Sequence, residues 1–502
     1  MAGLPAELET ARAKIEQIAK DCGLDFFTTI FEMVTSDQMS MLAAYGGFPV
    51  RYPHWRFGME YEQLSKSYRY GLSKIYEMVI NNDPSIAYLM DCNNYTDQKL
   101  VMAHVYGHVD FFKNNFFFSK TNRKMIDTMA NHGTKIRRIV DKVGIEKVED
   151  FIDVCLSIDN LIDYYSPFIQ RHDASEKVVH SEEEVIRFKS KRYMDRYINP
   201  PEFIEEQKEH IKKLANQSRK FPEYHQKDVL KFLLTYAPLD EWEYEILSII
   251  RNESYYFAPQ GMTKIMNEGW ASFWHSRIMT TRVLTDAEII DFADHHSGTV
   301  AMSPQRLNPY KVGIELFRNI FERWDHGQFG REYENLKTFD DKKHYKNYTG
   351  LGMEKVFEVR KIYNDVTFID EFLTEDFARE NKLFVYAYKE AHDHYEIASR
   401  KFSEIKQQLL FSLTNFGQPY IYIEDANYKN RTELYLKHEF NGIEIQMDYA
   451  VKVLESLSRI WKRPVNLETI VAKERRIYTY DGKKHDMKVY KEDTQTELEG
   501  VS

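Results

Sequence analysis

The 502-residue chain carries 78 acidic and 68 basic side chains, a formal net charge of −10 at neutral pH. The electrostatic field of a net negative charge repels a phosphate backbone, so the composition gives nucleic-acid binding no overall support. Aromatic residues make up 14% of the chain, whereas disordered chains are poor in them, and the length exceeds what one hydrophobic core fills. The sequence therefore predicts a folded protein with at least two packed units.

Three cysteines, Cys22, Cys92 and Cys155, lie far apart and are odd in number. This pattern argues against a disulfide framework and a thiolate zinc site, and it favours a reducing compartment. The N-terminal segment shows no secretory signal, and no stretch approaches the ~18 uncharged apolar residues of a membrane span. We therefore expect a soluble cytoplasmic protein that binds neither membranes nor nucleic acid.

The first part of the chain has helical periodicity. The spacing of apolar residues predicts helices over about 5–22 and 60–80, and the sequence Asn-Asn-Asp-Pro at 81–84 ends the second. Glu77 is thus expected near a helix C-terminus. A further helix is predicted over 97–118, with a buried aromatic end.

The middle of the chain changes character twice. Charged residues dominate 171–230, which predicts a solvated insertion without chemistry. Dense helical patterns return over 241–251 and 262–279, and the sequence Asp-His-His-Ser-Gly at 294–298 is expected to form a turn or loop. Residues 308–405 are predicted to be mostly helical.

After residue 406 the spacing of apolar residues changes from the helical period to the shorter period of strands. Strands are predicted at 420–423, 433–438, 475–480 and 486–490, with a helix at 448–461. We therefore predict a mainly α fold with a large helical domain over 1–406, including the charged insertion near 171–230. A small C-terminal α+β domain is predicted over 407–492, followed by a loose tail at 493–502.

His104 and His108 are four residues apart in the predicted helix 97–118. Residues at this spacing share one helix face, so the two imidazoles can bind one metal ion. A chain with 17 histidines also produces such spacings by chance, and a buried histidine can be satisfied by carbonyl groups. The pair is therefore a candidate metal site, with plain core packing as the alternative.

Glu268, Ser272 and His275 form a polar stripe on the predicted helix 262–279. Glu268 and His275 are about 10.5 Å apart along the helix axis, whereas zinc ligands lie within about 2.3 Å of the ion. We therefore predict Glu268 as the third ligand of a zincin-like His/His/Glu helix pair, and His275 as a supporting group or proton carrier. Alternatively, Glu268 simply pairs with a nearby lysine or arginine.

The familiar zinc hydrolase motif has glutamate, the general base, directly after its first histidine. Here that position is Val105. Either another group takes the proton, with Glu77, Tyr256 and His275 as candidates, or the site binds metal without hydrolysis. Asp110 is a poorer candidate because it lies about 200° around the helix from His108. Signatures of serine nucleophiles and of nucleotide binding are absent from the sequence.

Several stretches of the chain resemble the SpoVR (stage V sporulation protein R) family, over about residues 10–475. The stretches are YEMVIN at 76–81, the run 103–115, YYFAPQ at 255–260 leading into 266–275, NPY at 308–310, NFGQP at 415–419, ELYLKH at 433–438 and WKRPV at 461–465. The segment 268–271 is also similar to the third-ligand helix of zinc peptidases of the glutamate-ligand class, although Val105 departs from their pattern.

The family resemblance implies a cytoplasmic bacterial or archaeal protein linked to sporulation, through spore cortex formation, or to a stress response. It also implies a serine kinase and a von Willebrand-type protein as partners. We hypothesise a divalent metal site made of His104, His108 and Glu268, with zinc as the first choice and iron or manganese as alternatives. The rival hypothesis is a non-catalytic regulatory or scaffold protein that works with those two partners.

The catalytic hypothesis is metal-assisted hydrolysis of an amide or peptide-like bond. Its candidate catalytic residues are His275, Glu77 and Tyr256, and its candidate substrate-binding residues are Gln260 and Ser272. A third hypothesis, RNA contact through Arg137 and Arg138, has the net charge against it.

Overall fold

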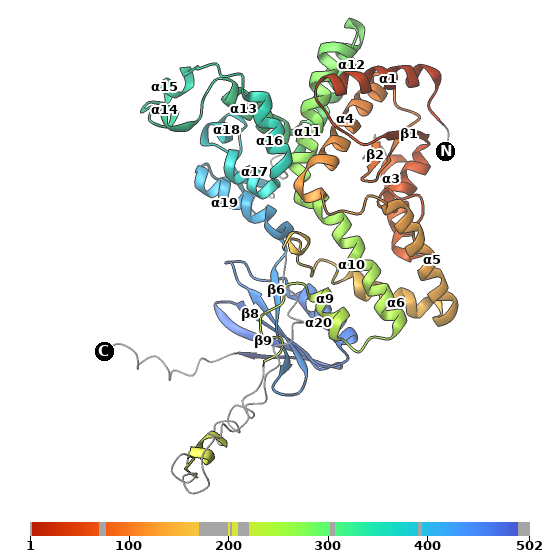
Figure 1. Ribbon diagram of the computed structural model, residues 1–502, viewed down its shortest axis with the longest axis vertical. Coiled ribbons are helices and arrows are strands. Elements are labelled where there is room, and N and C mark those ends of the chain that lie inside the picture. Colours follow the sequence, from red (N-terminus) through yellow and green to blue (C-terminus); the bar gives the residue numbers. More distant parts are fainter. Residues whose placement is uncertain are drawn as a thin grey trace. The chain divides into compact units, whose positions relative to one another are not determined.

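The computed structural model describes residues 3–69, 77–169, 199–200, 203–208, 220–301, 307–389 and 394–489. The chain divides into two compact units, one formed by residues 1–150 and 252–418 and the other by 151–251 and 419–502 (Figure 1). The fold is mainly helical and has a C-terminal β-sheet, as predicted. Across the described residues, no helix combines the length and the apolar character needed to cross a membrane.

The first unit packs helices around a small sheet. Its helices are α1 (Ala6–Asp21), α2 (Ser36–Ala44), α3 (Trp55–Arg69), α4 (Tyr95–Asn114), α5 (Met125–Val143), the end of α10 (Glu241–Met262), α11 (Lys264–Ile278), α12 (Ile289–Thr299), α13 (Pro309–Asp325), α14 (Gly330–Glu334), α15 (Phe339–His344), α16 (Gly352–Ile362), α17 (Asp365–Phe372), α18 (Glu375–Glu380) and α19 (Phe402–Leu413). The sheet has the order β1-β3-β2, in which β1 (Thr29–Val34) runs parallel and β2 (Glu77–Ile80) antiparallel to β3 (Ser85–Met90). Strands β4 (Val385–Lys389) and β5 (His394–Ser399) form a separate hairpin.

Helix α4 is buried along almost its whole length. Asn94 caps its N-terminus by accepting a hydrogen bond from the backbone N–H of Asp97 at 2.7 Å. At its end, the amide of Asn115 donates to the carbonyl oxygens of Arg360 and Tyr363. A helix surrounded on all sides by protein is fixed in position, so it suits a site that needs defined geometry.

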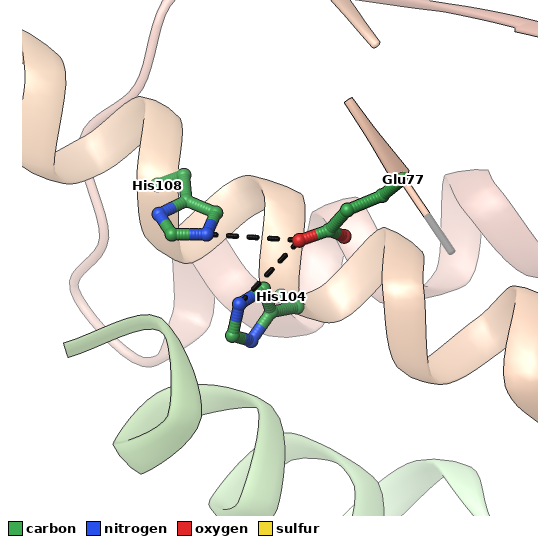
Figure 2. A group of neighbouring side chains, drawn as sticks. All are labelled: Glu77, His104 and His108. Carbon is green, nitrogen blue, oxygen red and sulfur yellow. Dashed lines mark ion pairs between the residues drawn. The ribbon is translucent and has the colours of Figure 1, made fainter. Parts of the chain in front are cut away.

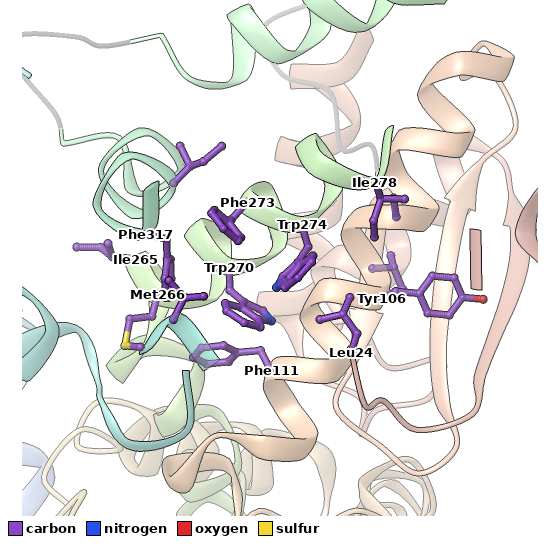
Figure 3. Packing of buried hydrophobic residues seen from close by; sticks show 14 of the residues in the cluster. Leu24, Tyr106, Phe111, Ile265, Met266, Trp270, Phe273, Trp274, Ile278 and Phe317 are labelled. Atoms are coloured by element: carbon purple, nitrogen blue, oxygen red, sulfur yellow. The ribbon is translucent and has the colours of Figure 1, made fainter. Parts of the chain in front are cut away.

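Helix α11 lies in the aromatic core of the first unit. Asp365 caps it from another element, because its carboxylate accepts the N–H groups of Ile265 at 2.7 Å and Met266 at 2.9 Å. Trp270 is fully buried among aromatic neighbours that include Phe317, and its ring N–H donates to Asp110 on α4 at 2.8 Å (Figure 3). The core therefore fixes α11 against both α4 and α13.

Glycines allow the three helices to approach closely. A Cβ atom on Gly107 of α4 would lie 2.7 Å from the Cα atom of Ala271 on α11. On the other side of α11, a Cβ on Gly269 would lie 2.5 Å from the backbone of Gly313 on α13. Side chains larger than hydrogen do not fit at these contacts, so the glycines set the spacing between the helices.

The second unit contains a five-stranded sheet in the order β10-β9-β8-β7-β6. Its strands are β6 (Tyr420–Tyr428), β7 (Glu433–Glu439), β8 (Val465–Val471), β9 (Glu474–Tyr480) and β10 (His485–Val489). Only β7 and β8 pair in parallel, and α20 (Met447–Trp461) connects them and packs on the sheet. The end of helix α6 (Ile145–Leu156), helix α9 (Val229–Tyr236) and the start of α10 belong to the same unit.

Some local predictions were wrong. The predicted helix over 60–80 is instead α3, which ends at Arg69, and strand β2, so Glu77 lies in a strand and not near a helix C-terminus. The expected loop at 294–298 is part of helix α12. Strands β1, β3 and β8 were not predicted, and the β4–β5 hairpin interrupts the predicted helical region 308–405. Most of the charged insertion near 171–230 lies outside the described residues.

Candidate metal centre

His104 and His108 lie one turn apart on α4, and both are 5% exposed. Their ring centroids are 4.5 Å apart and the rings are nearly perpendicular. The Nε2 atoms of both rings face a carboxylate oxygen of Glu77, which enters from strand β2 (Figure 2). These three side chains can place one ligand atom each around a single cation, since the atoms all lie within 4.8 Å of one another.

A second carboxylate reaches the same pair from α11. The Oε2 atom of Glu268 is 3.4 Å from the Nε2 atoms of both His104 and His108. The Oε1 atom of Glu77 is 3.5 Å from the Nε2 atom of His104 and 3.7 Å from that of His108. The structure thus brings together the three residues that the sequence suggested as ligands, and it adds Glu77 directly beside them.

The remaining ring nitrogens of the pair have partners that fix the rings. The Nδ1 atom of His108 lies 2.9 Å from the side-chain oxygen of Asn267, and the Nδ1 atom of His104 lies 2.8 Å from the Nδ1 atom of His275. If each Nδ1 of the pair carries the proton and donates it, both Nε2 atoms keep a free lone pair toward the carboxylates. This is how metal-binding histidines are commonly held.

The two glutamates have different surroundings. The Oε1 atom of Glu268 accepts from the ammonium group of Lys264 at 2.5 Å, so this carboxylate is held on its outer side. The Oε2 atom of Glu77 is buried and has no hydrogen-bond partner among the described residues, although the Glu77 side chain is 18% exposed. Glu268 is therefore a fixed group, and Glu77 has an oxygen that is available for a further partner.

The charges of the centre are strongly coupled. Burial alone would lower the pKa of His108, but the carboxylates of Glu268 and Glu77 outweigh it and raise the pKa to about 10. Burial would likewise raise the pKa of Glu268, yet His108, His104 and Lys264 hold it well below its ordinary value. The carboxylates therefore favour positive charge beside them, which either a proton on His108 or a cation in place of that proton can supply.

His275 connects the centre to α12. Its Nε2 atom lies 3.3 Å from the Nδ1 atom of His296, and burial together with the neighbouring histidines lowers the pKa of His275 well below its ordinary value. His295 points elsewhere and bonds Asp97 at 2.7 Å. Of these two adjacent histidines, His296 contacts His275 and His295 contacts Asp97.

The other suggested residues lie outside the immediate group. The hydroxyl of Tyr256 donates to the carbonyl oxygen of Asn81 at 3.0 Å. Gln260 is half-buried on α10 and makes no hydrogen bond to the group in the described part of the chain. Ser272 is fully buried on α11, and its hydroxyl has no partner among the described residues. Their suggested roles in catalysis and substrate binding stay predictions.

Sequence reasoning did not name three groups that support the centre, Lys264, Asn267 and Tyr310, although the ion pair of Glu268 with Lys264 agrees with the alternative in which Glu268 pairs with a nearby lysine. The ring of Tyr310, from the start of α13, stacks on His104 with centroids 6.1 Å apart. Lys264 and Glu268 have the i, i+4 spacing of a helical ion pair, so this contact could have been found from the sequence. No local signal places Tyr310, because it lies more than 200 residues from His104.

Comparison with known proteins identifies the class to which this fold and site belong. The family model described as "SpoVR like protein" matches residues 4–418, and the model described as "SpoVR-like C-terminal domain" matches residues 419–472. The chain belongs to the SpoVR family. It is 30% identical over 484 residues to a protein of Escherichia coli (strain K12) named "Uncharacterized protein YcgB", covering 92% of this chain and 91% of the relative. No solved structure matches the chain.

Proposed function

We propose that the first unit binds a divalent metal ion, with zinc as the preferred ion, and hydrolyses an amide or peptide-like bond. The observation that carries the proposal is the convergence of His104, His108, Glu77 and Glu268 in one buried centre. An ion held there would polarise a carbonyl group and make water a better nucleophile. The family resemblance extends the proposal to a substrate in spore cortex formation or a stress response.

The spacing of the donor atoms favours zinc. In a tetrahedral site with bonds of about 2.0 to 2.1 Å, neighbouring ligand atoms lie about 3.3 to 3.4 Å apart. In an octahedral magnesium site with similar bonds, they lie only about 3.0 Å apart. The nitrogen-to-oxygen distances here are 3.4 to 3.7 Å. Two imidazoles with carboxylates are also a donor set that suits zinc.

We assign different roles to the two glutamates. Glu268 is the third ligand, because Lys264 holds its outer oxygen and leaves Oε2 directed at both imidazoles. Glu77 is the general base that replaces the missing glutamate at Val105, because one of its oxygens has no hydrogen-bond partner in the described part of the chain and it is the most exposed of the four side chains. His275 supports the orientation of His104 through the contact between their Nδ1 atoms.

Elemental analysis of the protein purified without added metals is the first test. We expect about one zinc per chain, which is lost in His104→Ala and Glu268→Ala while circular dichroism shows an intact fold. His485→Ala, which removes an exposed histidine of the second unit, is the matched control and should keep the metal. A protein that takes up no divalent metal would contradict the proposal.

Glu77→Gln separates the two possible roles of that residue. A general base can be removed without loss of the ion, so the variant should keep its zinc. Its rate of hydrolysis of a panel of peptides and acylated amino acids should fall at least about 100-fold. Loss of zinc would make Glu77 a ligand instead.

Zinc binding without turnover in the unmodified protein would favour the second candidate, a non-catalytic scaffold for a serine kinase and a von Willebrand-type partner. The low exposure of the ligands supports that candidate.

A further inference from the structure

Amide hydrolysis develops negative charge on the carbonyl oxygen of the substrate, and this oxygen needs a hydrogen-bond donor. Most donors of the centre already have partners. The Nδ1 atoms of His104 and His108 lie against His275 and Asn267. The ammonium group of Lys264 binds the outer oxygen of Glu268. A donor for the substrate oxygen must therefore come from another side chain.

Tyr310 lies at the centre and carries such a donor. It is near the N-terminus of α13, where the side chain of Asn308 accepts from the backbone N–H of Tyr310 at 3.0 Å and Pro309 occupies the first helical position. Its ring stacks on His104 with an interplanar angle of 24°, and its hydroxyl interacts with the carboxylate of Glu268. The hydroxyl is thus held next to the proposed ligands from a well-fixed helix start.

The hydroxyl of Tyr310 is a phenol, which carries its proton at neutral pH. A neutral phenol can donate a hydrogen bond to a negatively charged oxygen, so it complements the charge that develops on the substrate. His275 does not offer this, since both of its ring nitrogens contact other histidines.

We propose that the Tyr310 hydroxyl donates a hydrogen bond to the oxygen that becomes negatively charged on the substrate carbonyl, an inference that rests on the hydrolytic function proposed above. In this step the hydroxyl turns from Glu268 to the substrate and keeps its proton. Water adds to the carbonyl carbon, the amide C–N bond breaks, and the leaving amine takes a proton from the water. Tyr310 is thus a catalytic residue that a search for acids and bases does not find.

The experiment measures binding of a tetrahedral anion in place of turnover. The protein is loaded with Co²⁺ and titrated with methylphosphonate, and the visible absorption of the cobalt reports occupancy. A hydrogen bond to a charged group contributes about 1.5 to 3 kcal/mol, so Tyr310→Phe should weaken phosphonate affinity at least about tenfold. Its Co²⁺ affinity should stay within about threefold. Tyr422→Phe, which removes a tyrosine hydroxyl bonded to Glu439 in the second unit, is the matched control and should leave phosphonate affinity unchanged.

Three results would overturn the inference alone: no phosphonate binding by the Co²⁺-loaded protein, equal phosphonate affinity in Tyr310→Phe, or loss of Co²⁺ affinity in that variant. The last result would mean that Tyr310 acts by positioning Glu268. A protein that binds no Co²⁺ overturns the proposed function together with the inference, so the two failures can be distinguished.

Discussion

Replacing Gly107 by alanine is expected to separate the two helices that carry the proposed ligands. The new Cβ atom would lie 2.7 Å from the Cα atom of Ala271, whereas carbon atoms in contact are about 3.5 to 4.0 Å apart. Relief of this overlap requires α4 and α11 to move apart by about 1 Å. Metal sites tolerate only about 0.2 Å in their bond lengths, so the 3.4 Å distances between Glu268 and the histidines would become too long.

The expected loss in affinity for zinc is at least about tenfold, measured by competition with a chromogenic chelator. Overpacking costs about 1 to 3 kcal/mol, and the better helix propensity of alanine returns about 1 kcal/mol. The free energy of unfolding in urea should therefore fall by at most about 2 kcal/mol. Gly58→Ala on α3 is the matched control, because nothing lies within 4 Å of its added methyl group and stability should stay equal or rise. Unchanged zinc affinity in Gly107→Ala would show that the two helices adjust without moving Glu268 away from the histidines.

Three further predictions concern groups around the centre. Asn267→Ala removes the partner of His108 Nδ1 and should weaken zinc binding about 10- to 100-fold in calorimetric titration, and an unchanged affinity would show that other contacts hold the ring. Arg360→Leu leaves the carboxylate of Asp110 buried without its cation and should lower the free energy of unfolding in urea by about 3 to 5 kcal/mol, and a loss below about 1 kcal/mol would contradict this. Burial raises the pKa of Asp365 to about 7, whereas its value in the unfolded chain is about 3.9. Between about pH 3.9 and about pH 7, the folded state therefore holds a proton that the unfolded state has lost. This contribution to stability is complete below about pH 4 and declines as the pH rises to 7. Asp365→Asn should remove that part of the slope of Tm against pH, and identical slopes in the two proteins would argue against it.

The part of the centre that the sequence predicts is the part set by helical periodicity. His104 and His108 share a face because they are four residues apart, and α4 has nearly the predicted bounds. The rise along one helix assigns Glu268 and His275 to different positions, and the structure places Glu268 beside the Nε2 atom of His104 and His275 beside its Nδ1 atom. These inferences need no knowledge of the tertiary fold beyond the existence of the two helices.

The rest depends on contacts between distant segments. Glu77 belongs to a strand of four residues that exists because it pairs with β3, and so short a segment has too little pattern to separate strand from helix. The pairing of β2 with β3 is what places Glu77 beside the histidines. His296 was expected in a loop because of its polar neighbours, although α12 continues through it to Thr299. Tertiary packing overrides local preference at both positions.

Three glycines set the spacing of the helices around the centre. Gly107 lies between the two histidines, Gly269 follows Glu268 directly, and Gly313 lies three residues after Tyr310. Glycine inside a helix costs about 1 kcal/mol relative to alanine, so the three positions together give up about 3 kcal/mol. A core that only had to be stable would place the helices slightly farther apart and fill the space with methyl groups. The close spacing instead puts the Oε2 atom of Glu268 3.4 Å from the Nε2 atoms of both His104 and His108, a separation that the proposed shared ion would require.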